Sequence, residues 1–224
     1  MKLLTFALAP SLVVALACQA KDGAQVAAAT PAAADSASAA DPRLARADSA
    51  RIQGSPTAKA WLVIVSDFQC PYCKQWHDAS AEAIRREYVE TGKIRVAYVN
   101  YPLGQHRQAV PTAEAAMCAG LQGKFWEYHD ALFATQARWQ DLANATPLLD
   151  SLASAVGLDL AAHKVCRDAD YMMPIIAADR DRAVAAGAES TPTFLVEGQV
   201  LKGVYPLILM RQVLDAAVAR AALR

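Results

Sequence analysis

The residues that most constrain the fold run from Trp61 to Cys73 and read W-L-V-I-V-S-D-F-Q-C-P-Y-C. The segment opens as an apolar run that is too short for a helix and centres on β-branched residues, which is typical of a strand covered on both faces. It ends in Cys70-Pro71-Tyr72-Cys73, and Pro71 suits the first position of a helix because it has no N–H group to leave unpaired. Helix formers follow to about Glu90. We therefore predict a strand, a tight turn, and a helix whose first turn carries two thiols.

A thiol at the start of a helix is expected to be reactive. Unpaired N–H groups and the positive end of the helix dipole stabilise the Cys70 thiolate, which lowers its pKa and makes it a nucleophile near neutral pH. Cys73, one turn later, is close enough to form a disulfide with it. One alternative is half of a zinc site, which needs two further ligands at matching spacing; haem attachment needs histidine where Lys74 stands. The pattern favours a reversible dithiol switch, and we expect neither a metal site nor a dissociable cofactor.

Residues 1–17 are predicted to be a signal peptide. Met1-Lys2 is followed by about 15 mostly apolar residues, which are too few to span a bilayer comfortably, and Ala15-Leu16-Ala17 has the small-x-small pattern of signal cleavage. Cys18 follows directly, so a lipoprotein anchored through Cys18 is an alternative to a soluble form. The five cysteines favour it, because lipidation would remove the odd thiol. In either case we expect export to the periplasm or cell envelope.

The remaining chain divides into a tether and a domain. Residues 18–50 are mostly Ala, Ser, Asp, Thr and Gln and cannot bury enough apolar surface to offset their ordering entropy, so they are predicted to be a flexible tether. A short helix near Ala40–Ala50 is compatible with so much alanine. Residues 51–224 suffice for one well-buried domain, which we expect to be monomeric. Because 22 basic residues balance 22 acidic ones, nucleic acid is not an expected partner.

The order of elements within residues 51–224 predicts an α/β fold. After the first strand and helix we expect a second strand at Ile94–Tyr101, helices almost throughout 112–186, a hairpin formed by Thr193–Val196 and Gln199–Lys202, and a final helix from Pro206. The first two strands should be parallel, since a helix joins them. Thioredoxin folds are built in this order, so we expect the helical block at about residues 105–187 to be an insertion between a β-α-β half and a β-β-α half. Within the insertion, the charged run from Asp179 to Arg182 is expected to be a solvated face.

Three motifs point to a family: S-D-F-Q-C-P-Y-C at 66–73, Q-G-K-F-W-E-Y-H-D-A-L-F at 122–133 and T-P-T-F-L-V-E-G at 191–198. Over about residues 51–224 the chain resembles the DsbA-like thioredoxin family of exported thiol–disulfide oxidoreductases. The resemblance implies that Thr191 and a cis Pro192 face the active-site cysteines and that Thr191 pairs with an extended segment of the substrate. From the residues alone, a proline at a strand start is the alternative. Tyr72 is expected to border the substrate groove.

Two residues depart from the family pattern. Family members commonly place a buried acid six residues before the first cysteine, as a proton acceptor for the second, where this chain has Ile64. Deprotonation of Cys73 must then rely on water or on another group. The strongest oxidants of the family have histidine where this chain has Tyr72, so Cys70 receives less electrostatic help and the couple should be less oxidising.

The remaining cysteines and histidines of the domain are also candidate site residues. Cys118 and Cys166 both fall in the helical block, where some family members carry a structural disulfide; two buried free thiols are the alternative. His77, one turn beyond Cys73, is expected to face solvent; the alternative is that it tunes the chemistry of the two cysteines. None of the other histidines has a spacing that suggests metal ligation.

Taken together, the motifs predict an exported enzyme that exchanges disulfides with cysteine-containing protein substrates, with oxidative folding as the leading direction. Cys70 would form the mixed disulfide, Cys73 would resolve it, and a membrane-bound or soluble redox partner would recycle the pair. A disulfide reductase or isomerase in the same compartment is one alternative. The other is a non-catalytic tethered binding module in which the C-x-x-C pair is only structural.

Overall fold

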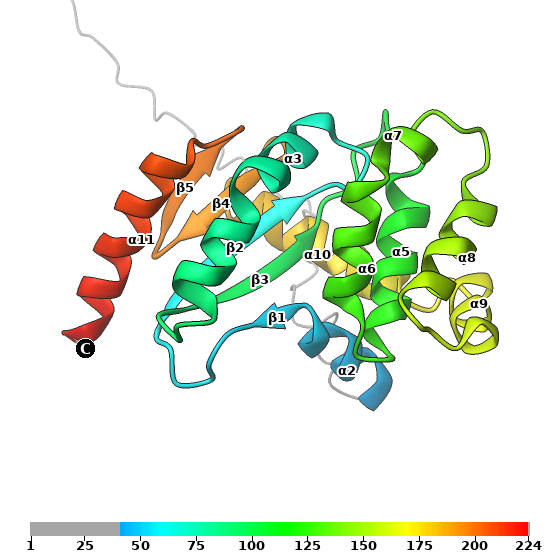
Figure 1. Cartoon of the computed structure of the whole chain (residues 1–224), viewed down its shortest axis with the longest axis horizontal. Helices are drawn as coiled ribbons and strands as arrows, with labels where there is room; N and C mark the ends of the chain where they lie inside the picture. Colours follow the sequence, from blue (N-terminus) through cyan, green and yellow to red (C-terminus); the bar gives the residue numbers. More distant parts are fainter. Residues whose placement is uncertain (1–40, 224) are drawn as a thin grey trace, which may run out of the picture. The chain divides into compact units, whose positions relative to one another are not determined.

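A computed structural model describes residues 41–223 of the chain (Figure 1). The predicted signal peptide, Cys18 and the predicted tether up to residue 40 lie outside these residues. Within 41–223, no helix is both long and apolar enough to cross a bilayer.

A five-stranded sheet with the order β1-β3-β2-β4-β5 forms the centre of the described chain. The strands are β1 (Ile52–Gln53), β2 (Ala60–Ser66), β3 (Ile94–Asn100), β4 (Thr193–Val196) and β5 (Gln199–Lys202). As predicted, β2 and β3 are parallel, and β4 and β5 form an antiparallel hairpin. The β4 strand joins the first half of the fold by pairing antiparallel with β2. The sequence did not predict β1, an antiparallel partner of β3, because two residues are too few to show a periodic pattern.

One continuous helical segment connects β2 to β3 and includes two π-helical stretches. Its parts are α3 (Pro71–Trp76), η1 (His77–Ala81), α4 (Glu82–Ile84) and η2 (Arg85–Val89). It ends at Val89, and the turn that follows contains Gly92, whose φ of 72° lies in the left-handed region that glycine adopts readily. The predicted helical block follows as α5 (Ala109–Gly120), α6 (Phe125–Ala134), α7 (Gln136–Trp139), α8 (Thr146–Ala155), α9 (Leu160–Asp168) and α10 (Met173–Ala185). The last helix, α11 (Leu207–Ala222), follows the hairpin, so the predicted α/β fold is confirmed.

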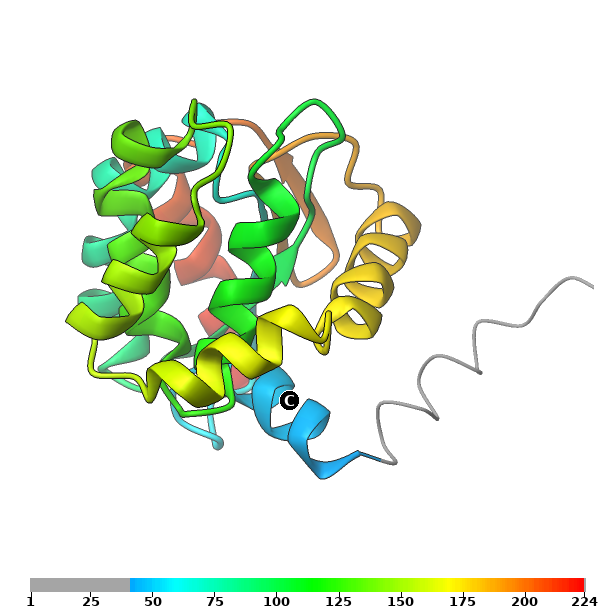
Figure 2. The ribbon, with the colours of Figure 1, turned by 90° about the vertical axis from the view of Figure 1, so that its right-hand side faces the viewer.

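The two faces of the sheet are covered by different helices (Figures 1 and 2). On one face, Trp76 and Ile84 of the α3–η2 segment pack with Met210 of α11 over the sheet. On the other, Ala183 of α10 packs against Val65 of β2. A third cluster lies mainly within the helical block and reaches Tyr98 of β3 and the two cysteines, Cys70 and Cys73, at the start of α3. The C-x-x-C turn therefore lies where the sheet meets the inserted helices.

The last residues of the predicted tether are ordered. Helix α2 (Pro42–Ala50) begins after Asp41, whose side chain accepts a hydrogen bond from the Arg43 N–H group at 2.9 Å. Leu44 and Ala47 are buried against the core of the helical block. The end of the segment predicted to be a tether therefore contributes two apolar side chains to this core. The short helix expected near Ala40–Ala50 is present.

The prediction that Asp179–Arg182 is a solvated face is wrong for its first residue. Asp179 is fully buried and pairs with the buried guanidinium of Arg51. Its carboxylate also accepts from the backbone and side-chain N–H groups of Asn100, at 3.0 and 2.9 Å. These bonds hold α10 against β3, and the reason is tertiary: the partners lie 79 and 128 residues away in the sequence.

Candidate active site

Cys70 lies at the N-terminus of the helix, as the sequence predicts. It is the N-cap of α3, with extended backbone angles (φ −68°, ψ 121°), and Pro71 takes the first helical position. The Cys70 carbonyl accepts the first helical hydrogen bond, from the Lys74 N–H group at 3.2 Å. The sulfur of Cys70 therefore lies beside the unpaired N–H groups of the first turn.

The surroundings of Cys70 favour its thiolate. Its pKa is lowered to about 6, first by a hydrogen bond from the Cys73 thiol, while burial acts in the opposite direction. Thr191, followed by the backbone N–H groups of Cys73 and Tyr72, lowers the pKa of Cys70 further. About nine tenths of the Cys70 thiols would thus be ionised at pH 7.

Cys73 has the opposite character. Burial raises its pKa well above the ordinary value, and the neighbouring Cys70 raises it further. Two groups act against this rise, the Asp67 N–H group and the Ser66 side chain. Ile64, where the family commonly has an acid, belongs instead to the apolar cluster with Trp76. Cys73 thus remains a neutral thiol that stabilises Cys70, and the polar groups around it come from the end of β2.

The Thr191–Pro192 segment faces the first cysteine. The peptide bond between Thr191 and Pro192 is cis, and the carbonyl oxygen of Thr191 lies 3.4 Å from the Cys70 sulfur. The Pro192 carbonyl accepts from the Gly203 N–H group at 2.8 Å, which ties this turn to the end of β5. Tyr72 has 60% of its surface exposed, which leaves its ring on the surface beside the two cysteines. The structure therefore brings together Cys70, Cys73 and Thr191 with Pro192, and places Tyr72 next to them.

Asp67 shapes the turn before Cys70 and was not singled out from the sequence. Its buried carboxylate accepts from the Gln69 N–H group at 2.8 Å, the Leu103 N–H group at 2.9 Å and the His106 Nδ1–H at 2.7 Å. Burial is the leading influence on its pKa, which is raised. Aspartate often forms a turn by accepting a hydrogen bond from the backbone N–H group two residues later. An aspartate directly after a predicted strand is therefore a sequence signal that could have identified this turn.

Gln136 ties the same turn to the helical block. Its side-chain N–H group donates to the carbonyl oxygens of Phe68, at 2.6 Å, and Cys70, at 3.1 Å. No sequence signal marks it, because it lies 66 residues from Cys70. The inserted helices thus contribute directly to the backbone geometry of the cysteine turn.

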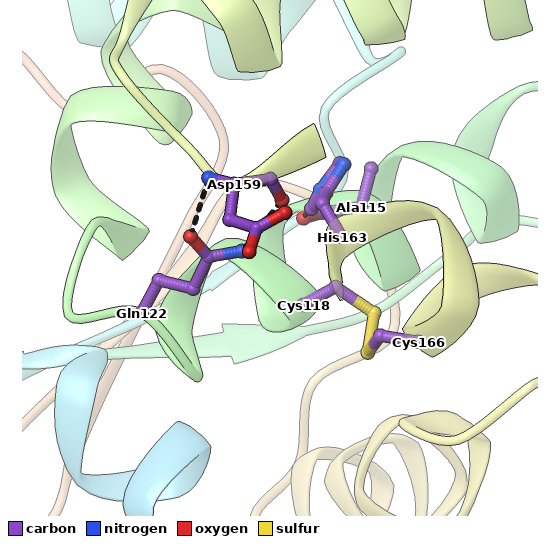
Figure 3. Close-up of a disulfide and its surroundings, with 6 residues drawn as sticks. All are labelled: Ala115, Cys118, Gln122, Asp159, His163 and Cys166. Carbon is purple, nitrogen blue, oxygen red and sulfur yellow. Dashed lines mark hydrogen bonds between the residues drawn. A yellow bond between two sulfur atoms is a disulfide. The ribbon is translucent and has the colours of Figure 1, made fainter. Parts of the chain in front are cut away.

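Cys118 and Cys166 form the disulfide that the resemblance implies (Figure 3). It joins α5 to α9 across 48 residues, and both residues are buried. Close by, the His163 ring bonds to the Ala115 carbonyl oxygen at 2.9 Å, and Gln122 binds the backbone of Asp159 through both of its amide atoms (Figure 3). This arrangement is a clamp between two helices, remote in the sequence from the C-x-x-C turn.

The cysteines of the turn are not part of a metal-binding cluster. Across residues 41–223, neither Cys70 nor Cys73 belongs to a group of three or more side chains that could ligate a metal together. Both are free thiols in the structure. Cys18, the proposed lipidation site, lies outside the described residues.

With this geometry established, comparisons with known proteins become informative. A family model described as "Thioredoxin" matches residues 46–216. The chain belongs to the thioredoxin family. Among solved structures, Wolbachia pipientis α-DsbA1 superposes with a TM-score of 0.69 at 21% identity, covering 77% of this chain and 92% of that one, so the thioredoxin fold here is of the DsbA-like kind.

Sequence relatives of this thioredoxin family member carry two kinds of name. "Na(+)/H(+) antiporter NhaA 1" of Salinispora arenicola is 33% identical over 180 residues, which cover 79% of this chain and 26% of that protein. "Putative protein-disulfide oxidoreductase" of Rickettsia typhi is 27% identical over 143 residues, covering 62% of this chain and 52% of that protein. The chain thus spans about a quarter of the antiporter's length and about half of the Rickettsia protein's.

Proposed function

We propose that this protein is an exported thiol–disulfide oxidoreductase that acts on cysteine-containing proteins through Cys70 and Cys73. The observation that carries the proposal is the contrast within the pair: Cys70 has a pKa of about 6 at the start of α3, and the buried Cys73 has a raised one. Such a pair supports attack by the first sulfur and resolution by the second. The family and its DsbA-like fold support the same reaction, and the name "protein-disulfide oxidoreductase" of a relative agrees with it.

The proposed reaction proceeds in two exchanges. In the oxidising direction, a substrate thiolate attacks the Cys70 sulfur of the Cys70–Cys73 disulfide, and Cys73 leaves as the displaced sulfur. A second substrate thiolate then attacks its own sulfur in the mixed disulfide, which releases Cys70 as a thiolate and leaves the substrate oxidised. A membrane or soluble redox partner must then accept the two electrons. No dissociable cofactor enters either step.

Residues 191 and 192 and Tyr72 would hold the substrate. The proximity of Thr191 to the Cys70 sulfur supports a role in aligning an extended substrate segment beside it. The exposed ring of Tyr72 offers apolar contact area on the same rim. We assign Thr191, Pro192 and Tyr72 to substrate binding, with the protein acting as a monomer.

Stabilisation of the thiolate favours the oxidising direction. Lowering the pKa of Cys70 from 9 to about 6 stabilises the reduced form at pH 7 by about 1.4 kcal/mol, which raises the reduction potential by about 30 mV. The Cys118–Cys166 disulfide supports an oxidising compartment, where such bonds persist. We therefore place oxidative folding before reduction or isomerisation, and propose export to the periplasm or cell envelope, with anchoring through Cys18 as one form.

The reduction potential of the Cys70–Cys73 couple tests the direction. A potential above about −200 mV, together with faster disulfide formation in a reduced, unfolded substrate, would support an oxidase. A potential near about −270 mV with efficient reduction of insulin would support a reductase instead. If reduced Cys70 reacts with iodoacetamide no faster than an unperturbed thiol at pH 6, the C-x-x-C pair is structural and the binding-module alternative stands.

A further inference from the structure

Three potential metal ligands meet where the helical segment that begins at Cys70 contacts α6 of the helical block. His77 is the first residue of η1, one turn after Cys73, and its backbone N–H group donates a hydrogen bond to the Cys73 carbonyl oxygen. His129 and Asp130 are neighbours on α6. The Asp130 Oδ1 atom lies 3.1 Å from Nε2 of His77 and 2.8 Å from Nδ1 of His129, and the three ligand atoms all lie within 4.8 Å of one another.

We infer that His77, His129 and Asp130 form a binding site for a divalent transition-metal cation, with Zn²⁺ as the best match. Tetrahedral zinc with bonds of about 2.0 Å places neighbouring ligand atoms about 3.3 Å apart, close to the two spacings observed. Two imidazoles and one carboxylate form a donor set that suits zinc and leaves a fourth position for water. The site is separate from the proposed dithiol exchange and does not depend on it.

The two imidazoles are held in place by their neighbours. The ring of His77 stacks on Phe133 with centroids 4.8 Å apart, and the ring of His129 meets Phe68 edge-on at 5.6 Å. Asp78 Oδ1 lies 3.4 Å from Nδ1 of His77 and favours the tautomer that leaves Nε2 free to bind a metal. Without a cation, the Asp130 carboxylate accepts a hydrogen bond from one ring nitrogen of each histidine. A bound cation would take the place of these two contacts, and each neutral ring would then carry its proton on its other nitrogen.

The site has both a shielded side and an open side. The side chains of His129 and His77 are 6% and 18% exposed, whereas that of Asp130 is 53% exposed. All three line one cavity of about 290 Å³, whose other walls include the apolar side chains of Trp76 and Trp126. Arg85 also borders this cavity, but its charge is offset by an ion pair with Glu82. A cation can therefore enter past Asp130 and become partly enclosed.

Binding there would join two parts of the fold. His77 belongs to the active-site helical segment, and the other two ligands belong to the inserted helical block, 52 and 53 residues later. A cation that binds the native state but not the unfolded chain raises the free energy of unfolding, and above the dissociation constant this increase grows with the logarithm of the free cation concentration. The site would therefore act as a clamp that fixes the active-site helix against α6.

The test is a titration of the full chain with ZnCl₂, followed by calorimetry and by the thermal unfolding midpoint. The Cys70–Cys73 pair is kept oxidised and Cys18 is alkylated, so that no thiol competes for zinc. The variants are Asp130→Asn and His77→Gln, which keep size and polarity. Glu127→Gln is the matched control, because it removes an exposed carboxylate from the same helix.

We expect one saturable zinc site per chain with micromolar affinity and an unfolding midpoint that rises with zinc. Asp130→Asn and His77→Gln should each weaken binding at least about tenfold, and Glu127→Gln should bind as the wild type does. Absence of saturation in the wild type up to about 100 µM free zinc would overturn the inference. Wild-type affinity in either ligand variant, or an equal loss in the control, would overturn it as well.

Discussion

The two cysteine pairs of this protein are equally buried and chemically opposite. Cys70 and Cys73 are 3% and 2% exposed and are free thiols, whereas Cys118 and Cys166 are 1% and 7% exposed and form a disulfide. The first pair lies within one helical turn beside backbone N–H groups, and the second joins two helices. Burial alone therefore does not decide what a cysteine pair does.

The difference lies in the polar groups near each sulfur. At Cys70, a neighbouring thiol and the N–H groups of the first turn stabilise a negative charge, so the pair can exchange. Cys118 and Cys166 lie in the apolar core of the helical block, and their bond restrains a long loop. One pair is thus placed to react and the other to stabilise, and each prediction below tests one side of this contrast.

The largest effect is expected from the reacting pair itself. Cys70→Ser should lower disulfide-exchange activity on the order of 10³-fold or more, because it removes the nucleophile. Cys73→Ala should lower turnover and accumulate a mixed disulfide on Cys70, since the resolving sulfur is gone. Mass spectrometry of Cys73→Ala after incubation with an oxidised substrate protein would detect the adduct. Finding no adduct with any substrate, while Cys70→Ser keeps its activity, would refute the assignment.

The second effect concerns the bridging pair and should be seen in stability. Replacing both Cys118 and Cys166 with alanine should lower the free energy of unfolding by up to about 4 kcal/mol, the chain-entropy value for a loop with a sequence separation of 48 residues. The reduction potential of Cys70–Cys73 should stay the same. Chemical denaturation and redox titration of the double variant measure the two quantities. A large change in potential with little loss of stability would reverse the roles given to the two pairs.

The third effect is the pH dependence of the reduced pair. Because the pKa of Cys70 falls to about 6 in the folded protein, the thiolate contributes stability that is complete above the ordinary pKa of 9 and is lost as the pH falls through 6. Between pH 5 and pH 7 the reduced form should gain about 1.4 kcal/mol relative to the oxidised form. Thiolate absorbance and denaturation of both forms, with Cys18 blocked, would show this. A titration midpoint of Cys70 near pH 9 would show that its thiolate is not stabilised, and the two cysteine pairs would then not differ in this respect.

The same titration in Cys73→Ala identifies the source of the shift. The hydrogen bond from the Cys73 thiol is the leading cause of the low Cys70 pKa, so the midpoint should move upward in this variant. An unchanged midpoint would assign the shift to Thr191 and the backbone N–H groups of Tyr72 and residue 73 instead.

Local patterns were enough to predict most of the fold and the reacting pair. The apolar run before Cys70, the proline after it and the order of strands and helices are all encoded within short stretches of sequence. The structure confirmed the parallel strands, the helical insertion and the hairpin. The Cys118–Cys166 bridge came from a family resemblance, because nothing local to either cysteine indicates its partner.

What the sequence missed depends on contacts between distant residues. The charged run at Asp179 looks solvated until Arg51 and Asn100 are placed beside it by the fold. His77 was expected to face solvent, yet its side chain is mostly covered because α6 supplies Phe133 and Asp130. A periodic pattern records which face of a helix is apolar, but it does not record which polar group on another element meets it.

The smallest effect should come from the surface residue between the two thiols. Tyr72→His should lower the pKa of Cys70 further and raise the reduction potential by about 30 mV or less, because a protonated imidazole beside the sulfur favours the thiolate. Tyr72→Phe is the matched control: it keeps the ring without adding charge and should leave the potential unchanged. Because the Tyr72 ring is 60% exposed, neither variant should alter stability much. Equal shifts in the reduction potential of both variants would mean that the ring contacts of Tyr72, rather than charge, set the potential. No shift in either variant would mean that the buried hydrogen bonds at Cys70 set the potential and that the side chain at position 72 does not contribute.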